Sequence, residues 1–356
     1  MDNKGFTIEL YNSQNATQTF IADITRLCKS VSATIRLNNV SDLSFSIEIE
    51  SWKEFCKDSG IDAATAFKPL ASEIKLKYNG TYLPHAFEVQ TVPKSYGVDS
   101  KTFQINARDT AIKLGRRVTF RSFSAVDSAK ISRDMITYSQ AKQYGDFGIT
   151  FGNTYLTGVA TDRKEWTATG KVILDAIREL SDDVSGGFDF YFDHDWKYYS
   201  MAKRGSIKDK QFVYGGDTSN VVSMEVPDDG TIIANSVYVV GNGIGNPVIS
   251  SPNTDTTSAI TYRLSEKTLS YSDASAARAE QISQREVRDR KDGYYLPKIT
   301  VSEDELDPTQ IYIGDTIPFE CKDEFSPFVG NGRIKELTIN LSDDFYATFT
   351  LELLRA

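Results

Sequence analysis

Apolar and polar residues alternate along most of the first hundred positions of the chain, which is the pattern of β-strands that bury one face. The alternating apolar residues are Phe6, Ile8 and Leu10; Phe20, Ala22 and Ile24; Val31, Ala33, Ile35 and Leu37; Leu43, Phe45, Ile47 and Ile49; Ile74, Leu76 and Tyr78; and Tyr82, Phe87 and Val89. The Asn79-Gly80 pair between the last two runs is a strong signal for a two-residue hairpin. Short strands at this spacing predict one all-β unit over residues 1–105, a small barrel or a sandwich. Residues 52–68 interrupt it as a short helix or a long loop.

The stretch from residue 102 to residue 121 marks the change from pure β to mixed structure. A strand pattern at Phe103, Ile105 and Ala107 ends at Asp109, which offers a helix N-cap. A short helix is predicted next, because Ala111, Ile112 and Leu114 form one apolar face and Gly115 can end the helix in a left-handed conformation. A second strand is predicted after it, where Val118 and Phe120 resume the alternation. Residues 106–210 therefore read as an α/β unit.

Two longer helices and a hairpin are predicted inside the α/β unit. Asp127 is a possible cap for a helix over residues 127–144, and residues 145–161 read as loops with a short strand. Thr169 is the predicted cap of a second helix, which ends near Gly186-Gly187 and carries the apolar stripe Val172, Ile173, Ala176, Ile177 and Leu180. A hairpin then turns at residues 193–197, between Phe188, Phe190 and Phe192 on one strand and Tyr198, Ser200 and Ala202 on the other.

Three stretches of the chain, in this order, resemble the tail-tip or baseplate hub proteins of tailed phages and prophages. The first joins Arg108-Asp109 to Arg116-Arg117-Val118 through the short helix, and the second is VILDAIRELSDDVSGGFDFYFDHDWKYYSMAKRG. The third is SNVVSMEVPDDGTIIANSVYVVGNG, in which Asn235, Val237, Val239 and Gly241 match an N-x-V-x-V-x-G strand. A later IYIGDTI resembles the lGD-x-V turn of these proteins. The resemblance rests on the order and spacing of these stretches over essentially the whole chain.

The resemblance implies an α+β, β-rich fold with two small β-barrel domains, an intervening α/β domain and an inserted small subdomain. The boundaries that follow are 1–105 for the first barrel and 106–210 for the α/β domain. The second barrel takes residues 211–250 plus 293–356, and the insert with one helix takes residues 251–292. Within the second barrel, Ile299 and Val301 predict one strand, and residues 333–341 and 345–353 predict a closing hairpin.

The resemblance also implies a function and partners. Such a hub is a structural protein of the virion tail tip, assembled in the host cytoplasm. It forms a homotrimer whose six barrels close the end of the tail tube. Its implied partners are a distal tail ring protein, a tape-measure protein and tip or receptor-binding proteins, and DNA passes through it without specific binding. No enzymatic activity, catalytic residue, metal site or cofactor is expected.

Composition agrees with a globular protein and argues against some other classes. The chain has 356 residues, 40% of them hydrophobic and 25% charged, and a net charge of −9 that disfavours a tight nucleic-acid clamp. No run of apolar residues is long enough for a membrane-spanning helix, and we expect no secretion signal. Cys28, Cys56 and Cys321 are widely spaced and odd in number, so we expect free thiols.

Several motifs could carry chemistry, and each has a plainer interpretation. The loop at residues 241–246, GNGIGN, resembles a phosphate-binding loop, but Pro247 follows where a helix would have to start, so a flexible linker is favoured. Asp193-His194-Asp195 could ligate a metal, but the motif lies at a hairpin tip with no second histidine nearby. Paired carboxylates stand at Asp182-Asp183, Asp228-Asp229 and Asp343-Asp344, where they read as a solvated helix end and solvated turns.

Two alternative functions remain open. One is a tail-associated endopeptidase or peptidoglycan hydrolase, but His85 and His194 are the only histidines and fall in different predicted domains, so a nucleophile triad is not expected. Longer members of the resembled family carry such activity in C-terminal extensions, and we expect none after the last predicted strand. The other is a cell-wall carbohydrate-binding module that uses tyrosines and phenylalanines as stacking platforms. The helix over residues 273–291 is charged nearly all round and is predicted to be solvated.

Overall fold

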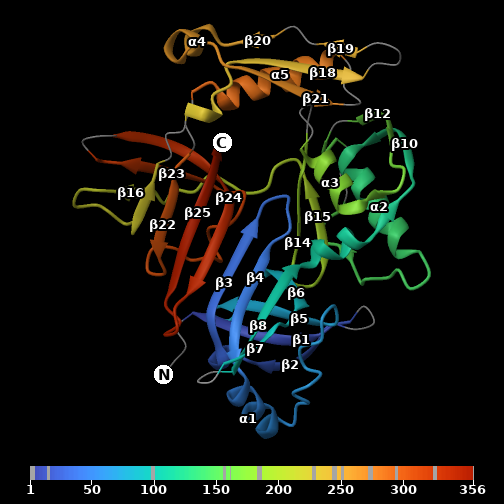
Figure 1. Ribbon diagram of the computed structural model, residues 1–356, viewed down its shortest axis with the longest axis vertical. Coiled ribbons are helices and arrows are strands. Elements are labelled where there is room, and N and C mark those ends of the chain that lie inside the picture. Colours follow the sequence, from blue (N-terminus) through green and yellow to red (C-terminus); the bar gives the residue numbers. More distant parts are fainter. Residues whose placement is uncertain are drawn as a thin grey trace.

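The computed structural model describes residues 5–13, 17–97, 101–154, 158–160, 162–182, 187–226, 230–242, 247–249, 252–271, 276–292, 296–323 and 327–355. Helix α1 lies at one end of the long axis and helices α4 and α5 lie at the other (Figure 1). Between them the strands of the first and last parts of the chain stand side by side, with the middle part packed along one flank (Figure 1).

The first part of the chain forms the expected all-β unit, and the interruption that the sequence leaves open as a short helix or a long loop contains one helix. Its elements are β1 (Phe6–Asn12), β2 (Thr19–Asp23), β3 (Cys28–Arg36), β4 (Asp42–Glu48), α1 (Ile49–Ser59), β5 (Ser72–Tyr78), β6 (Thr81–Thr91), β7 (Lys94–Tyr96) and β8 (Lys101–Asp109). Asn79 and Gly80 both have positive φ, as a two-residue hairpin between β5 and β6 requires. The alternation fails at Phe20, which is 53% exposed, because a bulge in the β1–β2 pairing places Phe20 opposite Tyr11 while Ala22 stays opposite the buried Leu10.

The last part of the chain continues the same sheet. Its elements are β16 (Phe212–Tyr214), β17 (Ser223–Glu225), β22 (Lys298–Ser302), β23 (Thr316–Cys321), β24 (Phe328–Leu341) and β25 (Ala347–Arg355). Strand β24 pairs antiparallel with β3 from Glu336 opposite Arg36 to Leu341 opposite Val31, so the two β units share one sheet and one hydrophobic core. The predicted hairpin is present as β24 and β25.

The predicted closed barrels are not confirmed. Hydrogen-bonded pairing among the described strands follows one open path, β17-β22-β25-β24-β3-β4-β8-β6-β5-β1-β2, with β7, β16 and β23 attached at its sides. The fold is β-rich and α+β, as predicted. No helix within the described ranges is long and apolar enough to cross a membrane.

The middle part of the chain forms the α/β unit around its own core. Its elements are the 3₁₀-helix η2 (Thr110–Arg116), β9 (Val118–Thr119), β10 (Ser122–Asp127), α2 (Ser128–Gln140), β11 (Thr150–Phe151), β12 (Asp162–Thr167), β13 (Lys171–Val172), α3 (Ile173–Ser181), β14 (Asp189–Phe192) and β15 (Lys197–Met201). Asp109 and Asp127 cap η2 and α2 as predicted, accepting hydrogen bonds from backbone N–H groups of the first turn.

Two predicted helix boundaries in this unit are wrong. Gly115 does not end its helix in a left-handed conformation, because it lies inside η2, which ends at Arg116 and is capped by Arg117 in an extended conformation. Thr169 does not cap α3, because Gly170 has φ +69° and the next two residues pair with β9 before the helix begins. The apolar stripe of α3 is nevertheless buried as predicted at Ile173, Ala176, Ile177 and Leu180.

A small separate unit contains β18 (Ser236–Asn242), β19 (Pro247–Ile249), β20 (Asn253–Thr254), α4 (Thr256–Tyr262), β21 (Glu266–Tyr271) and α5 (Ala276–Arg290). The structure differs here from the predicted boundaries, because β18 pairs with β19, β20 and β21 and not with the large sheet. The unit also has a second helix, α4. Helix α5 is not solvated all round, because Ala279, Ile282 and Val287 pack against β18 in a third hydrophobic cluster.

Candidate functional site

A buried ion pair joins the first β unit to the α/β unit. The Lys113 ammonium lies 2.8 Å from Oε1 of Glu73, and the two side chains are only 5% and 0% exposed. Trp196 Nε1 donates to both oxygens of Glu73, at 3.0 and 2.9 Å, and the Lys113 ammonium stands 3.6 Å from the Trp196 ring centroid. Both buried charges are therefore matched, which is the condition under which such a pair is tolerated. The cluster fixes β5, η2 and the β14–β15 turn to one another.

The Asp193-His194-Asp195 motif belongs to the same contact. The His194 ring stacks on Tyr82 with centroids 4.6 Å apart, and Asp195 lies 3.5 Å from the Lys75 ammonium. Asp193 Oδ1 accepts the backbone N–H groups of Asp195 and Lys197 and so shapes the turn. Desolvation lowers the pKa of His194. Within the described part of the chain, no group of three or more His, Cys, Asp or Glu side chains is placed to hold a metal ion.

A second buried cluster joins the α/β unit to the last β unit. The Arg204 guanidinium lies 3.6 Å from the Tyr191 ring centroid and 5.1 Å from that of Tyr312. Asp189 Oδ2 accepts the backbone N–H of Arg204 at 2.5 Å and a hydrogen bond from the Arg333 guanidinium. Desolvation lowers the pKa of Arg204 and raises that of Tyr312. The cluster links β14 to β24 through one carboxylate.

His85, from the first β unit, packs against this second buried cluster. Its ring lies parallel to Tyr312 at 6.5 Å, and its Nδ1 is 3.5 Å from Oδ2 of Asp109. Among the described residues, both ring nitrogens of His85, Nη1 of Arg204 and the Tyr312 hydroxyl are buried without a hydrogen-bond partner. His85 thus lies in an enclosed structural junction, in the first β unit, while His194 lies at the α/β surface.

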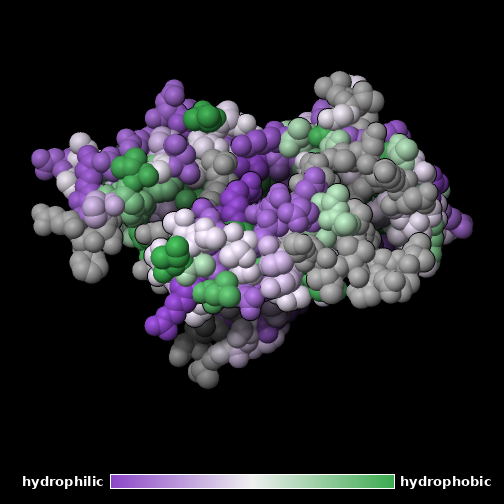
Figure 2. Space-filling model, turned by 90° about the horizontal axis from the view of Figure 1, so that it is seen from above, coloured by the Kyte–Doolittle hydropathy of each residue, from purple (hydrophilic) through white to green (hydrophobic). Residues whose placement is uncertain are grey.

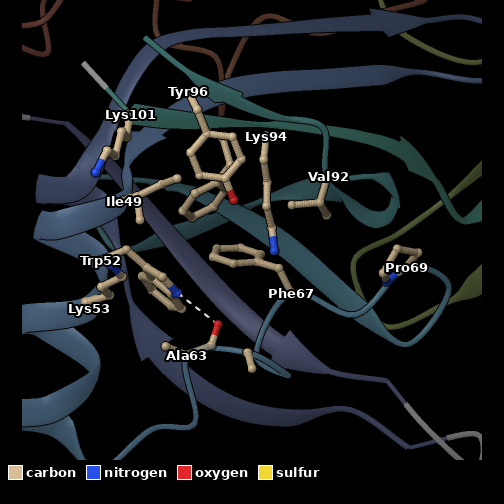
Figure 3. A pocket seen from close by; sticks show the side chains of 12 residues that line it. Ile49, Trp52, Lys53, Ala63, Phe67, Pro69, Val92, Lys94, Tyr96 and Lys101 are labelled. Atoms are coloured by element: carbon tan, nitrogen blue, oxygen red, sulfur yellow. Dashed lines mark hydrogen bonds between the residues drawn. The ribbon is translucent and has the colours of Figure 1, made fainter. Parts of the chain in front are cut away.

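An open aromatic pocket lies beside α1, at the end of the molecule remote from α4 and α5 (Figures 1 and 3). It encloses about 580 Å³ between α1, the loop that follows it, and strands β7 and β8. Trp52, Phe67 and Phe103 form its wall, with ring centroids 4.8 Å (Trp52–Phe67), 5.6 Å (Phe67–Phe103) and 6.2 Å (Trp52–Phe103) apart. Trp52 Nε1 donates to the Ala63 carbonyl at 3.2 Å, which ties the loop to the helix (Figure 3).

The sequence did not single out this pocket. Trp52 and Phe67 fall in the segment for which the sequence predicts a short helix or a long loop, and Phe103 falls in a predicted strand. The available signal was the concentration of aromatic residues at positions 52, 55 and 67 inside an otherwise polar segment.

The remaining candidates from the sequence, the glycine-rich loop and the paired carboxylates, do not come together in one site or lie outside the described residues. Gly241 and Asn242 end β18, while residues 243–246 of the glycine-rich loop, Asp183, Asp228 and Asp229 lie outside the described ranges. Asp343 and Asp344 are exposed in the β24–β25 turn. The three cysteines are free, as predicted, and all three are buried. Burial raises the pKa of the Cys28 thiol, and that of Cys56 to about 11.

The face that carries the small unit is mainly hydrophilic across its middle, and its hydrophobic residues form separate spots (Figure 2). Exposed apolar side chains on that unit include Ile260 at 86% and Leu264 at 60%. Scattered apolar side chains of this kind are ordinary on a protein surface and do not define a site by themselves.

No protein-family model and no curated protein sequence matches the chain. Solved structures share its fold. The tail protein from Neisseria meningitidis has a TM-score of 0.67 at 10% identity over 99% of this chain and 97% of that one. The 43 kDa tail protein of prophage MuSo2 from Shewanella oneidensis has a TM-score of 0.67 at 13% identity over 99% and 97%.

A third similar structure is the Escherichia coli c3393 protein. It is described as a component of the type VI secretion system with structural similarity to the phage T4 tail proteins gp27 and gp5. Its TM-score is 0.51 at 10% identity, over 92% of this chain and 73% of that one. These likenesses show the fold, and at that level they confirm the predicted resemblance to phage tail hub proteins.

Proposed function

We propose that this protein is the structural hub of a phage tail tip or baseplate. Three copies form a ring that closes the distal end of the tail tube, connects it to tip or host-recognition proteins and leaves a channel for DNA. The observation that carries the proposal is the likeness to two tail proteins over their whole length, 97% of each, and not over one shared domain.

The arrangement of the two β units supports a ring. They share one sheet through β3 and β24, and each carries antiparallel strands around a common core. If each β unit occupies one of the equivalent places around the ring, three copies with two β units each fill six places, which matches a sixfold tube. The Glu73–Lys113 and Asp189–Arg333 contacts hold the α/β unit to both β units. Buried contacts between all three units favour a rigid subunit, which suits a ring that bears mechanical load.

The oligomeric state tests this proposal directly. Light scattering on a gel-filtration column is expected to give three times the 39.7 kDa of one chain at high protein concentration, or, after mixing with the distal tail ring protein, a complex that contains three copies of this chain. A ring with threefold symmetry in electron micrographs of the same fraction is the second expected result. A monomer under both conditions would rule the hub out.

We further propose that the role is structural and not enzymatic. His85 is enclosed in the junction, and His194 stacks on Tyr82, so neither stands as a base beside a serine or cysteine nucleophile in the described part of the chain. Purified protein incubated with host peptidoglycan is expected to release neither reducing sugar nor free amine. Release that disappears in Asp195→Ala would support the hydrolase alternative.

A further inference from the structure

We propose that the aromatic pocket beside α1 binds an extended peptide segment of another protein, which carries one large apolar side chain flanked by acidic residues and adds as a strand along β7. The proposal is independent of the hub function. It rests on three features of the described residues: the shape and lining of the pocket, the charges around it, and the strand edge next to it.

The pocket offers a place for one large apolar side chain. Its wall is the Trp52, Phe67 and Phe103 cluster, and Figure 3 shows Val92, Lys94 and Tyr96 converging on it from the opposite side. Val92 is half-buried, and Tyr96 is 69% exposed although it is aromatic. A volume of about 580 Å³ is larger than one side chain needs, so part of a backbone can enter with it. Burying an aromatic or branched side chain here would remove apolar area of both partners from water.

The charged side chains that line the pocket, among the residues that the structure describes, are all lysines. They are Lys53, Lys94 and Lys101. Lys53 is matched by Glu50 at 3.0 Å, whereas no described carboxylate forms an ion pair with Lys94 or Lys101. The chain as a whole carries a net charge of −9, so this site is a local positive area on an acidic protein. Such an area attracts carboxylates and repels basic segments.

Strand β7 supplies the third feature, an unoccupied sheet edge. In the described part of the chain β7 pairs on one side only, with β8. The Pro93 carbonyl accepts the Gln104 N–H, and hydrogen-bonding residues alternate along an antiparallel ladder. Pro93 and Ser95 therefore direct their backbone groups at β8. The backbone N–H and C=O groups of Lys94 and Tyr96 point to the open edge.

The edge and the pocket together favour a peptide over other occupants. The two residues whose backbones face the open edge are the same two whose side chains line the pocket. A peptide that adds to the edge would satisfy those backbone groups, and its alternate side chains would meet the aromatic wall and the ammonium groups of Lys94 and Lys101. A lipid tail would use the aromatic wall alone and would leave the edge groups to water, and a sugar has no repeating backbone that matches the spacing of the N–H and C=O groups along the edge.

A selection experiment tests the proposal without a known partner. A displayed library of random twelve-residue peptides is selected on the intact protein, and binding of the enriched peptides is measured by fluorescence anisotropy. Enriched sequences are expected to contain an aromatic or branched residue between aspartates or glutamates. Poly(glycerol phosphate) serves as an anionic probe with neither a peptide backbone nor an apolar side chain.

Three changes to the protein separate the features. Ala64→Trp fills the pocket from its exposed loop, and Lys94→Glu with Lys101→Glu reverses the free charges, so each is expected to weaken binding by about tenfold or more. Lys57→Glu is the matched control, because Lys57 is exposed on the same helix but does not line the pocket, and it is expected to leave affinity unchanged. Circular dichroism confirms that each variant is folded.

The peptide itself tests the strand edge. Two versions of an enriched peptide are compared, one N-methylated at its odd-numbered residues and one at its even-numbered residues (the two methylated registers). One version is expected to lose binding and the other to keep it, since only one set of N–H groups would face β7. The proposal is overturned if enriched peptides bind Ala64→Trp as well as the unmodified protein, or if both methylated registers bind. Pocket-dependent binding of poly(glycerol phosphate), with no pocket-dependent peptide, would overturn it in favour of an anionic polymer.

Discussion

Glu73 has no exposed surface, and its charge is matched by the Lys113 ammonium and by hydrogen bonds from Trp196 Nε1 and Gln18 Nε2. Removing one member of a buried pair leaves the other charge uncompensated, which costs about 3–5 kcal/mol. We therefore expect Lys113→Met to lower the urea midpoint strongly, and Glu73→Gln/Lys113→Met to recover much of the loss. Lys53→Met is the matched control, because its pair with Glu50 is solvent-exposed and its loss should not be measurable. Equal effects of Lys113→Met and Lys53→Met would contradict the assignment.

His85 makes stability depend on pH. Desolvation by burial lowers the pKa of His85 below its ordinary value of 6.5, against the opposing pull of Asp109. The unfolded chain takes up a proton on this histidine below about pH 6.5, whereas the folded chain takes it up only at a lower pH. The contribution of His85 to the free energy of unfolding should therefore be complete above that pH and be lost on acidification. The slope of the free energy of unfolding against pH should approach about 1.4 kcal/mol per pH unit for this one histidine.

The variant His85→Phe isolates this contribution. Its urea midpoint should change less between pH 7 and pH 5 than that of the unmodified protein. His194 has a lowered pKa as well, so His194→Asn should remove a smaller part of the same dependence. An unchanged slope in His85→Phe would show that other groups carry the acid sensitivity.

At the scale of elements, local chemistry was predictable and partnership was not. Asp109 and Asp127 cap their helices, because the carboxylate accepts hydrogen bonds from backbone N–H groups only two or three residues further along the chain. Such a contact does not depend on any distant part of the sequence. Thr169 failed as a cap because a pairing with β9, distant in sequence, draws the chain into a strand first. Helix α5 looked solvated because its apolar residues are few, but β18 covers them.

The candidate pocket could not be predicted for the same reason. Trp52, Phe67 and Phe103 come from a helix, a loop and a strand, and only the packing of α1 on β8 brings them together. The buried charge of Glu73 is likewise invisible in a strand that alternates normally. Sequence patterns report which face of an element is apolar, and not which other element will meet it.

The core of the small unit gives a prediction at this scale. Ile282 on α5 is completely buried in a cluster separate from the two larger cores. We expect Ile282→Asp to unfold this unit locally, because an unpaired charge in an apolar cluster is costly. Limited proteolysis should then cut first within residues 236–290, while the rest of the chain stays protected. Gln284→Asp, at an exposed position two residues along α5, should leave the digestion pattern unchanged.

At the scale of the whole molecule, the pairing of β3 with β24 is the feature that the sequence pattern could not provide. The two strands stand about three hundred positions apart, as the Arg36–Glu336 ion pair across them shows. Alternation predicted both strands but left their neighbours open. The collinear resemblance predicted the β-rich α+β class, but it did not predict that the two β units share a sheet, and its two closed barrels are not confirmed.

The hub proposal makes one further demand on the whole molecule, that DNA passes without being held. Each lysine or arginine that reached a phosphate would release counterions and so retain the duplex. The chain has 49 acidic against 40 basic residues, and many basic side chains are engaged by carboxylates, including Lys113, Arg116 and Arg333. We therefore expect weak binding in a filter titration with duplex DNA at low salt. If instead the protein bound tightly, and the logarithm of its affinity fell steeply with the logarithm of salt concentration, the surface would carry a row of phosphate contacts that a conduit cannot have.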